Sequence, residues 1–449
     1  MRAIGVVQRG SSVRSIPEAA LTEELSDAAI GTICSNLGHR WRDRQLPPPV
    51  MVRSMIHRSL HPNHSIRATL VHLAAWNPRN ASTPTDSAWC QARSRLPEEL
   101  LPQLLERSAE RLARMAGPQY HYRGRPVYIH DGSTVSMPDE PELVEVFGYA
   151  KARHGLSRFP LARVSFLMQA GTEGIVDYRL DAYRTSEDAQ FHAMWHRIPR
   201  GALCLCDRHY SSFYNLAKLR QRGIAVLSRL HQRRDPQRLM ARGRKVGPNE
   251  WMVPLELAPQ LRRRYNDPRL PQRTHVRLIR VTYRRHGIRR TLWLVTTLLD
   301  AQRYPRRELV GLYRRRWGIE TRIGSVKTSL EMAVLRSKSE ANIRKEVAAI
   351  LLAHNLTWIV IHQSARQHDI CPDRISFTGA VQTILAYCYS LDVCRGPQRS
   401  DIYAAMLHTV ASQVNRYRPN RLEPRLVKRV RQRYSFLKIP REQARRTLT

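Results

Sequence analysis

One segment, residues 313–327, most strongly constrains how this chain can fold. At about 100° per residue, the four polar side chains Tyr313, Arg316, Glu320 and Lys327 fall within roughly 60° of one helical face. Beside that face runs an apolar stripe of Leu312, Ile319, Ile323, Val326 and Leu330. Such a helix packs its stripe on a core and presents one acid among three phosphate-compatible groups, which predicts a metal ligand beside bound phosphate. The alternative is an amphipathic surface helix with a chance ion pair.

The charge of the chain favours a nucleic-acid partner. Its 449 residues contain 75 Lys and Arg against 37 Asp and Glu, a formal net charge of +38. The excess runs along the whole chain, which favours a long polyanion over a small acidic substrate. The length allows roughly two to four domains, and a hydrophobic fraction of 42% can fill their cores.

Neither a membrane span nor a disulfide framework is predicted. No apolar run reaches the roughly 18 residues of a spanning helix, and the start of the chain lacks a signal-peptide core. Residues 347–361 come closest, but His354 and Asn355 interrupt them, which predicts a buried core helix. The seven cysteines fit neither zinc spacing nor paired bridges. Two of them, Cys204 and Cys206, are expected on one strand face as small core residues. We therefore expect a cytoplasmic protein.

Residues 1–118 are expected to form a helical DNA-binding domain. Helical periodicity resumes after residues 61–63 and continues to Trp76. Pro97, followed by two acids, predicts a helix that begins with proline near its first position. Arg93 and Arg95 lie beside the joint before it, either as DNA contacts or as ordinary solvated arginines.

After Gly117-Pro118 the pattern changes to strands, so we expect an α/β core with a mixed sheet. The first part of that core spans residues 119–235 and the second spans 300–365. The expected elements are a strand at 125–131 that stops at Gly132-Ser133, a hairpin at 163–170 and 174–183, a helix at 186–198, a buried strand at 202–207, a helix at 211–222 and a strand at 224–230.

Two further regions complete the expected organisation. Residues 236–299 read as a β-rich insertion, with strands at 274–283 and 288–299. Residues 366–449 read as a basic helical region. It ends in the charge run 424–434, which either contacts the DNA backbone or is simply a solvated helix.

Asp131 and Asp207 each end a strand that is expected to be buried. Burying a carboxylate is costly unless it is paired or binds a metal. With Glu320, the two aspartates could hold two divalent cations roughly 4 Å apart, an arrangement that supports phosphodiester displacement. Mg²⁺ suits such oxygen ligands best. Taken singly, Asp131 could be a turn residue and Asp207 could pair with Arg208.

The chain resembles the DDE transposases of the IS-four group of bacterial insertion sequences. Three motifs carry the likeness: Asp131-Gly-Ser-Thr-Val-Ser-Met-Pro, Leu205-Cys-Asp207-Arg-His-Tyr, and Tyr313-x2-Arg316-x3-Glu320-x6-Lys327. The third motif is the specific one and is complete. Residues 91–97 and the late segment 424–441 are also similar to group members, so the resemblance covers most of the chain.

The resemblance implies a ribonuclease-H-like core whose Asp131, Asp207 and Glu320 bind two Mg²⁺ ions, for which Mn²⁺ can substitute. It also implies an insertion between Asp207 and Glu320. In hairpin-forming relatives, a tryptophan at the end of that insertion stacks on a flipped base, and Trp293 stands at the corresponding place. The alternative for Trp293 is a core residue of its strand.

We therefore expect a transposase that binds terminal inverted repeats of an element, cleaves DNA and transfers strands, with a hairpin route left open. Tyr313, Arg316, Lys327 and Arg208 are the expected phosphate contacts of the core. The implied partners are double-stranded terminal and target DNA and a second copy of the chain, in a bacterial, nucleoid-associated setting. The alternatives are a nuclease or resolvase without strand transfer, and a non-catalytic DNA-binding derivative.

Overall fold

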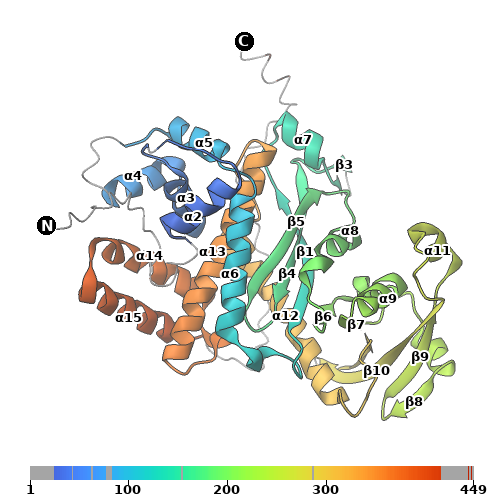
Figure 1. The fold of residues 1–449 in the computed structure, drawn as a ribbon. Coiled ribbons are helices and arrows are strands. Elements are labelled where there is room, and N and C mark those ends of the chain that lie inside the picture. The colour runs from blue at the N-terminus through green and yellow to red at the C-terminus, as the bar shows by residue number, and fades with distance from the viewer. Residues whose placement is uncertain are drawn as a thin grey trace.

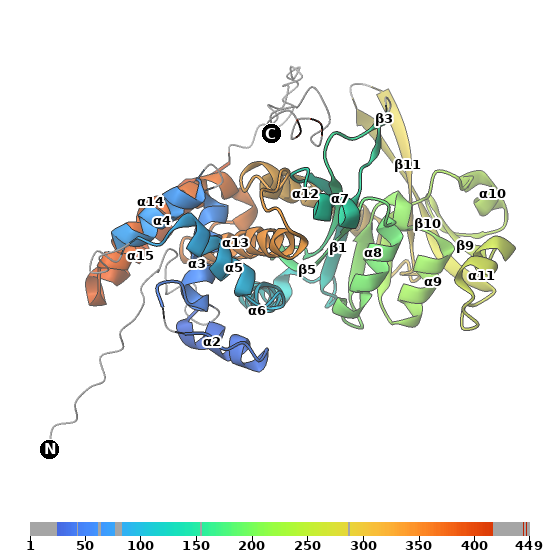
Figure 2. The same ribbon diagram turned by 90° about the horizontal axis from the view of Figure 1, so that it is seen from above.

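The computed structural model describes residues 25–42, 44–61, 64–76, 83–152, 155–285 and 288–415, together with Gln443 and Arg446. The charge run 424–434 and residues 1–24 lie outside this range. Figures 1 and 2 show a helical part, built from both ends of the described chain, beside a large twisted sheet. The fold class is the expected one, a mixed α/β sheet flanked by helical regions.

The described strands form a nine-stranded sheet in the order β5-β4-β1-β6-β7-β11-β10-β9-β8 and a two-stranded sheet, β2-β3. In the large sheet, β1 pairs antiparallel with β4 and parallel with β6, and β6 pairs parallel with β7. These four strands, together with β5, form the part of the sheet that lies before the inserted segment. The strands of this part are β1 (Val127–Ser136), β2 (Lys151–Ala152), β3 (Gly155–Leu156), β4 (Leu161–Gln169), β5 (Gly174–Ala182), β6 (Leu203–Cys206) and β7 (Ala225–Arg229).

Strand β1 is longer than the sequence predicts. We expected it to stop at Gly132-Ser133, but it continues to Ser136 because β4 provides partners along its whole length, with Gly132 opposite Ser165 and Ser136 opposite Leu161. Glycine has no side chain to pack, and here the cross-strand hydrogen bonds outweigh its weak strand preference. Asp131 therefore lies within a strand rather than at its end.

Helices cover both faces of the core strands, and alternate residues of each strand enter two separate cores. Ile129, Leu205 and Leu227 pack with α12 (Arg306–Thr328) and α13 (Glu340–Gln367). Tyr128, Cys204 and Val226 face the other way, toward α8 (Glu187–Met194) and α9 (Phe213–Gln221). Figure 2 shows these two helix pairs on opposite sides of the sheet. The Sγ atoms of Cys204 and Cys206 are 3.4 Å apart in the second core, as small apolar residues.

The inserted segment extends the same sheet. Its elements are α10 (Pro236–Ala241), β8 (Arg244–Gly247), β9 (Glu250–Glu256), α11 (Pro259–Tyr265), β10 (Arg273–Arg285) and β11 (Ile288–Thr296). The last strand, β11, pairs antiparallel with β7, Leu294 opposite Arg229 and Thr296 opposite Leu227. A buried ion pair between Arg277 and Glu250 joins β10 to β9, and Arg277 also donates to the Tyr304 carbonyl at 2.7 Å.

The N-terminal part is helical as predicted. Its helices are α2 (Asp27–Asn36), α3 (Pro48–Leu60), α4 (Ile66–Trp76), α5 (Asp86–Arg95) and α6 (Leu100–Ala116). Helix α6 begins at Leu100 rather than at Pro97, because Pro97 belongs to a turn in which the Leu100 amide donates to its carbonyl at 3.3 Å. Its apolar face, with Leu104, Leu105 and Leu112 fully buried, packs along α13 as the spacing indicates.

Helix α13 joins the helical part to the sheet. Of the described helices, it is the one long and apolar enough to cross a membrane, and 94% of its most apolar stretch is buried inside the protein. It contacts α3, α6, β5, α14 (Phe377–Val393) and α15 (Gly396–Ser412). The other described elements are α7 (Pro141–Phe147) and the short 3-10 helices η1 (Pro118–Tyr120), η2 (Trp195–Arg197), η3 (Arg208–Tyr210) and η4 (Pro372–Arg374).

Four histidine rings gather where α3 meets α4. His57, His61, His64 and His72 have ring centroids between 4.2 and 6.4 Å apart. Burial, followed by repulsion from the neighbouring imidazoles, lowers the pKa of His57 to about 2 and that of His61 to about 4. The folded state therefore disfavours protonation of His57 and His61.

We predict that this cluster makes the protein acid-labile. Unfolded histidines bind protons near pH 6.5, whereas the folded rings resist protonation down to about pH 4 for His61 and about pH 2 for His57. Their contribution to stability is therefore complete above pH 6.5 and declines as the pH falls below it. Melting temperatures measured from pH 7.5 to 5 should fall, and less steeply in His61→Gln. The exposed His275→Gln should follow the wild type, and an equal change in both variants would contradict the prediction.

Candidate catalytic site

The parallel pairing of β1 with β6 brings the two aspartates together. The pairs Val127–Leu203 and Ile129–Leu205 fix the register, and continuing it by two residues places Asp131 beside Asp207. Residues paired in this way point to the same face of a sheet, on strands about 4.8 Å apart. Both side chains are only partly exposed. The two carboxylates thus share the face that α12 covers.

Helix α12 lies across this pair, in contact with β1, β6 and β7. Its backbone carries Tyr313, Arg316, Glu320 and Lys327 as the sequence predicts. Arg316 Nη1 lies 3.6 Å from Asp131 Oδ2, and Lys327 Nζ donates to Ser133 Oγ at 2.9 Å. The side chain of Glu320 lies outside the described residues. Its backbone position is one turn after Arg316 and two turns before Lys327, on the helical face that meets β1.

The surroundings of Asp131 favour its ionised form. The Gly132 amide donates to Asp131 Oδ1 at 2.9 Å, and the Arg316 guanidinium faces the other oxygen. Arg316 itself is only 4% exposed. Sequence analysis assigned Arg316 to phosphate binding, but the group that it faces in this structure is the Asp131 carboxylate.

Burial shifts the pKa values of Tyr313 and Lys327, two further polar residues of this helix face. Tyr313 is 4% exposed, and burial raises the pKa of its hydroxyl. The negative charge of Asp207 also raises this pKa, whereas the positive charges of Arg316 and Arg229 lower it. Burial also lowers the pKa of Lys327. Arg316 lies over the Tyr313 ring, with its central carbon 5.9 Å from the ring centroid. The helix face is thus a packed, partly dehydrated surface, in which charge acts more strongly than in open water.

Arg229 is a neighbour of the site that sequence reasoning missed. The pair Cys206–Ser228 fixes the register of β6 with β7, so Arg229 follows beside Asp207. It lies on the same face, and its charge acts on Tyr313. Asp131, Asp207 and Arg229 therefore form one row across three strands. The only signal in the sequence was an arginine at the end of a predicted strand, and the register of β7 could not be read from it.

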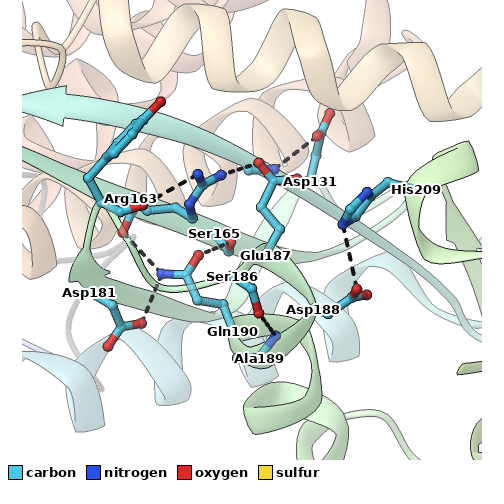
Figure 3. A network of polar contacts seen from close by, with 12 residues as sticks. Asp131, Arg163, Ser165, Asp181, Ser186, Glu187, Asp188, Ala189, Gln190 and His209 are labelled. Atoms are coloured by element: carbon cyan, nitrogen blue, oxygen red, sulfur yellow. Dashed lines mark hydrogen bonds and ion pairs between the residues drawn. The ribbon is translucent and has the colours of Figure 1, made fainter. Parts of the chain in front are cut away.

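A polar network supports β1 from the opposite face (Figure 3). Glu187, in the first turn of α8, forms an ion pair with Arg163, and Tyr210 donates to its carboxylate at 3.3 Å. Ser165 donates to Gln190 at 2.6 Å, and Gln190 donates to Asp181 at 2.8 Å. A Cβ at Gly132 would meet Ser165 Oγ at 3.4 Å, so the network lies close to the strand next to Asp131. Its bonds join β4 to α8, β5 and η3.

Arg208 and Trp293 lie at the same edge of the sheet. Arg208 is exposed and follows Asp207 directly. Trp293 precedes Leu294, the partner of Arg229, so the register places it two strands away from Asp207. Its half-buried ring lies 5.8 Å from that of Trp251, and strand alternation puts it on the opposite face from the aspartates. The site edge is therefore within reach of Trp293, but the tryptophan also has a packing partner.

The two N-terminal arginines have different surroundings. Arg93 is 8% exposed, stacks over Trp89 at 5.0 Å and donates to Ser337 Oγ at 3.0 Å. This burial argues against direct DNA contact and favours a role in joining α5 to the core. Arg95 is exposed and lines an open pocket of about 760 Å³. The other basic and aromatic residues of this pocket are His39, Arg40, Trp41, Arg42 and Arg44.

The donor chemistry at the paired strands suits a hard divalent cation. Asp131 and Asp207 offer carboxylate oxygens on one face of neighbouring strands, which is the ligand type that Mg²⁺ prefers. Among the described side chains, no group of three or more His, Cys, Asp or Glu is placed to hold a metal ion. A third ligand would have to come from Glu320, whose backbone lies on the helix above them.

Comparisons with known proteins identify the family of the chain. The family described as "Transposase DDE domain" matches residues 122–356, and "Insertion element 4 transposase N-terminal" matches residues 18–106. The chain is 26% identical to the transposase InsG of insertion sequence element IS4 from Escherichia coli K12, over 95% of each chain. A piggyBac transposase, solved in a synaptic complex with hairpin DNA, aligns with 96% of this chain and 92% of its own at 9% identity and a TM-score of 0.46. The DDE match covers more than half of the chain, which therefore belongs to the DDE transposases of the IS4 family.

Proposed function

We propose that the protein binds the terminal inverted repeats of its own element, cleaves the DNA there and joins the freed ends to target DNA. The observation that carries this proposal is the row formed by Asp131, Asp207 and Arg229 beneath α12. Two carboxylates in a packed, basic surrounding suit phosphodiester chemistry, in which negative charge must be met on both sides of the reacting phosphorus.

Asp131, Asp207 and Glu320 would hold two Mg²⁺ ions, or Mn²⁺ in their place. Bound there, the ions would supply an activated water and stabilise the leaving oxygen. The Arg316 guanidinium lies 3.6 Å from the Asp131 carboxylate and favours its charged form.

The chemistry consists of two displacements at phosphorus. In the first, a water oxygen bonds to phosphorus and the bond to the 3′ oxygen breaks, which leaves a 3′-hydroxyl and a 5′-phosphate. In the second, the oxygen of that hydroxyl bonds to a phosphorus of the target or of the opposite strand, and the bond from this phosphorus to its 3′ oxygen breaks, which releases a new 3′-hydroxyl. Attack on the opposite strand gives a hairpin, which a further water must open before the end can join target DNA. Lys327, Arg229 and Arg208 neutralise the neighbouring phosphates, and the uncharged Tyr313 hydroxyl lies beside them.

DNA recognition begins in the N-terminal part. The pocket that Arg95 lines brings Arg40, Arg42 and Arg44 beside the exposed Trp41, and all four arginines are exposed. Arginines bind phosphates and an aromatic ring can stack on a base. Two DNA ends must be held together for joining, so we propose a homodimer on DNA. The protein would act in the cytoplasm, on the nucleoid.

The rival functions differ in their products. A nuclease or resolvase on the same core would nick a labelled terminal duplex without joining it to a plasmid. A non-catalytic derivative would bind that duplex and leave it intact in Mg²⁺ or Mn²⁺. The terminal duplex itself can be read from the DNA that flanks the gene, where matched inverted repeats are expected.

We predict that Asp131→Asn, Asp207→Asn and Glu320→Gln each abolish cleavage and joining while leaving binding to the terminal duplex largely intact. Each removes a ligand charge without a large change of shape. Asp267→Asn breaks the ion pair between Asp267, in the inserted segment, and Lys218, in α9. This variant controls for the loss of a paired carboxylate. Near wild-type cutting in Mg²⁺ by any of the three variants would show that its residue is not a ligand.

The net charge leads to a prediction about salt. If phosphate contacts dominate binding, log affinity falls linearly with log salt, by about 0.9 for each phosphate neutralised. Titrations of a labelled terminal duplex between low and moderate salt measure this slope. A slope equivalent to one or two contacts would mean that most of the +38 charge never meets DNA.

Trp293→Ala tests stacking against packing. A base stacked on Trp293 contributes about 1–3 kcal/mol, so its loss should slow second-strand cleavage and spare the first nick. Trp251→Ala removes the packing partner and serves as the matched control. If Trp293 is instead a core residue, its truncation costs about 3–5 kcal/mol of folding stability. A lower melting temperature, with both cleavage steps reduced equally in both variants, would rule out stacking.

A further inference from the structure

The outer halves of β10 and β11 form a ribbon that leaves the sheet. β9 pairs with β10 only as far as Ile279, and β7 pairs with β11 only from Leu294 onward. The Arg280 amide still donates to the Asn249 carbonyl at 2.9 Å, and the Trp293 carbonyl accepts from the Leu230 amide at 2.8 Å. Beyond these bonds, the backbones of residues 281–285 and 288–292 pair only with each other within the described chain. Five residues of strand extend about 17 Å. Figure 2 shows this ribbon standing clear of the other strands of the sheet.

One face of the ribbon carries two arginines directly opposite each other. Arg284 pairs with Arg289, and the next pair on the same face is Thr282 with Thr291. All four side chains are exposed. Like charges directly opposite on paired strands destabilise the ribbon, and the segment 280–293 contains no acidic residue. Within the described residues, neither arginine has a carboxylate partner, so an anion from outside would relieve the repulsion.

The other face differs. It carries Tyr283 opposite Arg290, followed by Val281 opposite Leu292, which packs against the main core. Near the tip, Ile288 is 57% exposed. The polar face is therefore the one with paired cationic and hydroxyl groups, and hydroxyls and guanidinium groups both donate hydrogen bonds to phosphate oxygens.

The ribbon also lies at the edge of the sheet where the two aspartates are found. Strand β6 ends at Cys206, just before Asp207, and β7 ends at Arg229. Strand β11 runs antiparallel to β7 and extends beyond that edge. DNA held at the aspartates would leave the site along the same edge. The major groove of duplex DNA is about 12 Å wide and admits a two-stranded ribbon.

We propose that the β10–β11 ribbon is an arm that grips duplex DNA leading away from the catalytic edge, with Arg284 and Arg289 on phosphates and Thr282 and Thr291 beside them. This inference rests on the proposed function, which identifies the bound DNA as the end of the element and its flanking sequence. Its contacts are separate from the carboxylates and from the pocket lined by Arg95, so it can be tested without catalysis.

The test compares two double variants of full-length protein. Arg284→Gln/Arg289→Gln removes the opposed pair, and Arg262→Gln/Arg263→Gln removes two exposed arginines from α11 as a charge-matched control. Binding to a fluorescent 40-base-pair duplex that carries the element end and its flanking DNA is measured in EDTA at several salt concentrations. We expect the ribbon variant to bind about tenfold more weakly, with a log–log slope lower by about 1.8, or 0.9 per phosphate. The control should keep the wild-type slope.

Two further readouts distinguish a DNA-binding arm from a ribbon that only stabilises the fold. Removing a like-charge pair should leave the melting temperature unchanged or raise it, so a clear fall would point to a structural role and overturn the proposal. Equal losses in both double variants, or none in the ribbon variant, would also overturn it. Because binding is measured without metal, wild-type protein that binds the duplex through the arm but neither cleaves nor joins it would refute the proposed chemistry and leave the arm standing.

Discussion

The parallel pairing of β1 with β6 is the interaction on which the candidate catalytic site depends. It sets Asp131 beside Asp207, and the next pairing, of β6 with β7, adds Arg229 to the same row. A shift of one residue would turn every side chain of the moved strand to the other face. Asp207 would then point toward α8 and α9, away from the helix that carries Glu320. The two cores on either side of the sheet hold the register, because each strand feeds alternate residues into both.

The helices hold this sheet at a fixed place in the molecule. α13 is buried along most of its length between the N-terminal helices and β5. At its first turns, Lys345 donates to the carbonyls of Arg93 and Ser94, while Arg93 donates to Ser337. These buried cations join parts of the chain that are about 250 residues apart in sequence. The position of the helical part relative to the site therefore rests on specific polar contacts as well as on apolar packing.

The arginines of the chain fall into two groups with different roles. Some are buried and paired, such as Arg277 with Glu250 and Arg316 with Asp131, and these organise the fold and the site. Others, on the ribbon and around the pocket of Arg95, are exposed, and they suit a polyanion. Net charge alone does not separate these groups. Its effect on DNA binding depends on which guanidinium groups the fold leaves facing water.

The sequence by itself determined the main helices and strands that carry the candidate site. Periodicity predicted α6, α12 and the buried α13, the apolar run predicted β6, and the spacing of Tyr313, Arg316, Glu320 and Lys327 placed them on one helix. These patterns are local, so a single chain reveals them. The continuation of β1 past Gly132, the burial of Arg93, the row that includes Arg229 and the free ribbon of β10 and β11 were decided only by tertiary structure. Each of these features depends on which distant strand or helix lies alongside. Hydrogen bonds and burial between segments that are far apart in sequence produce no periodic pattern of residues in either segment.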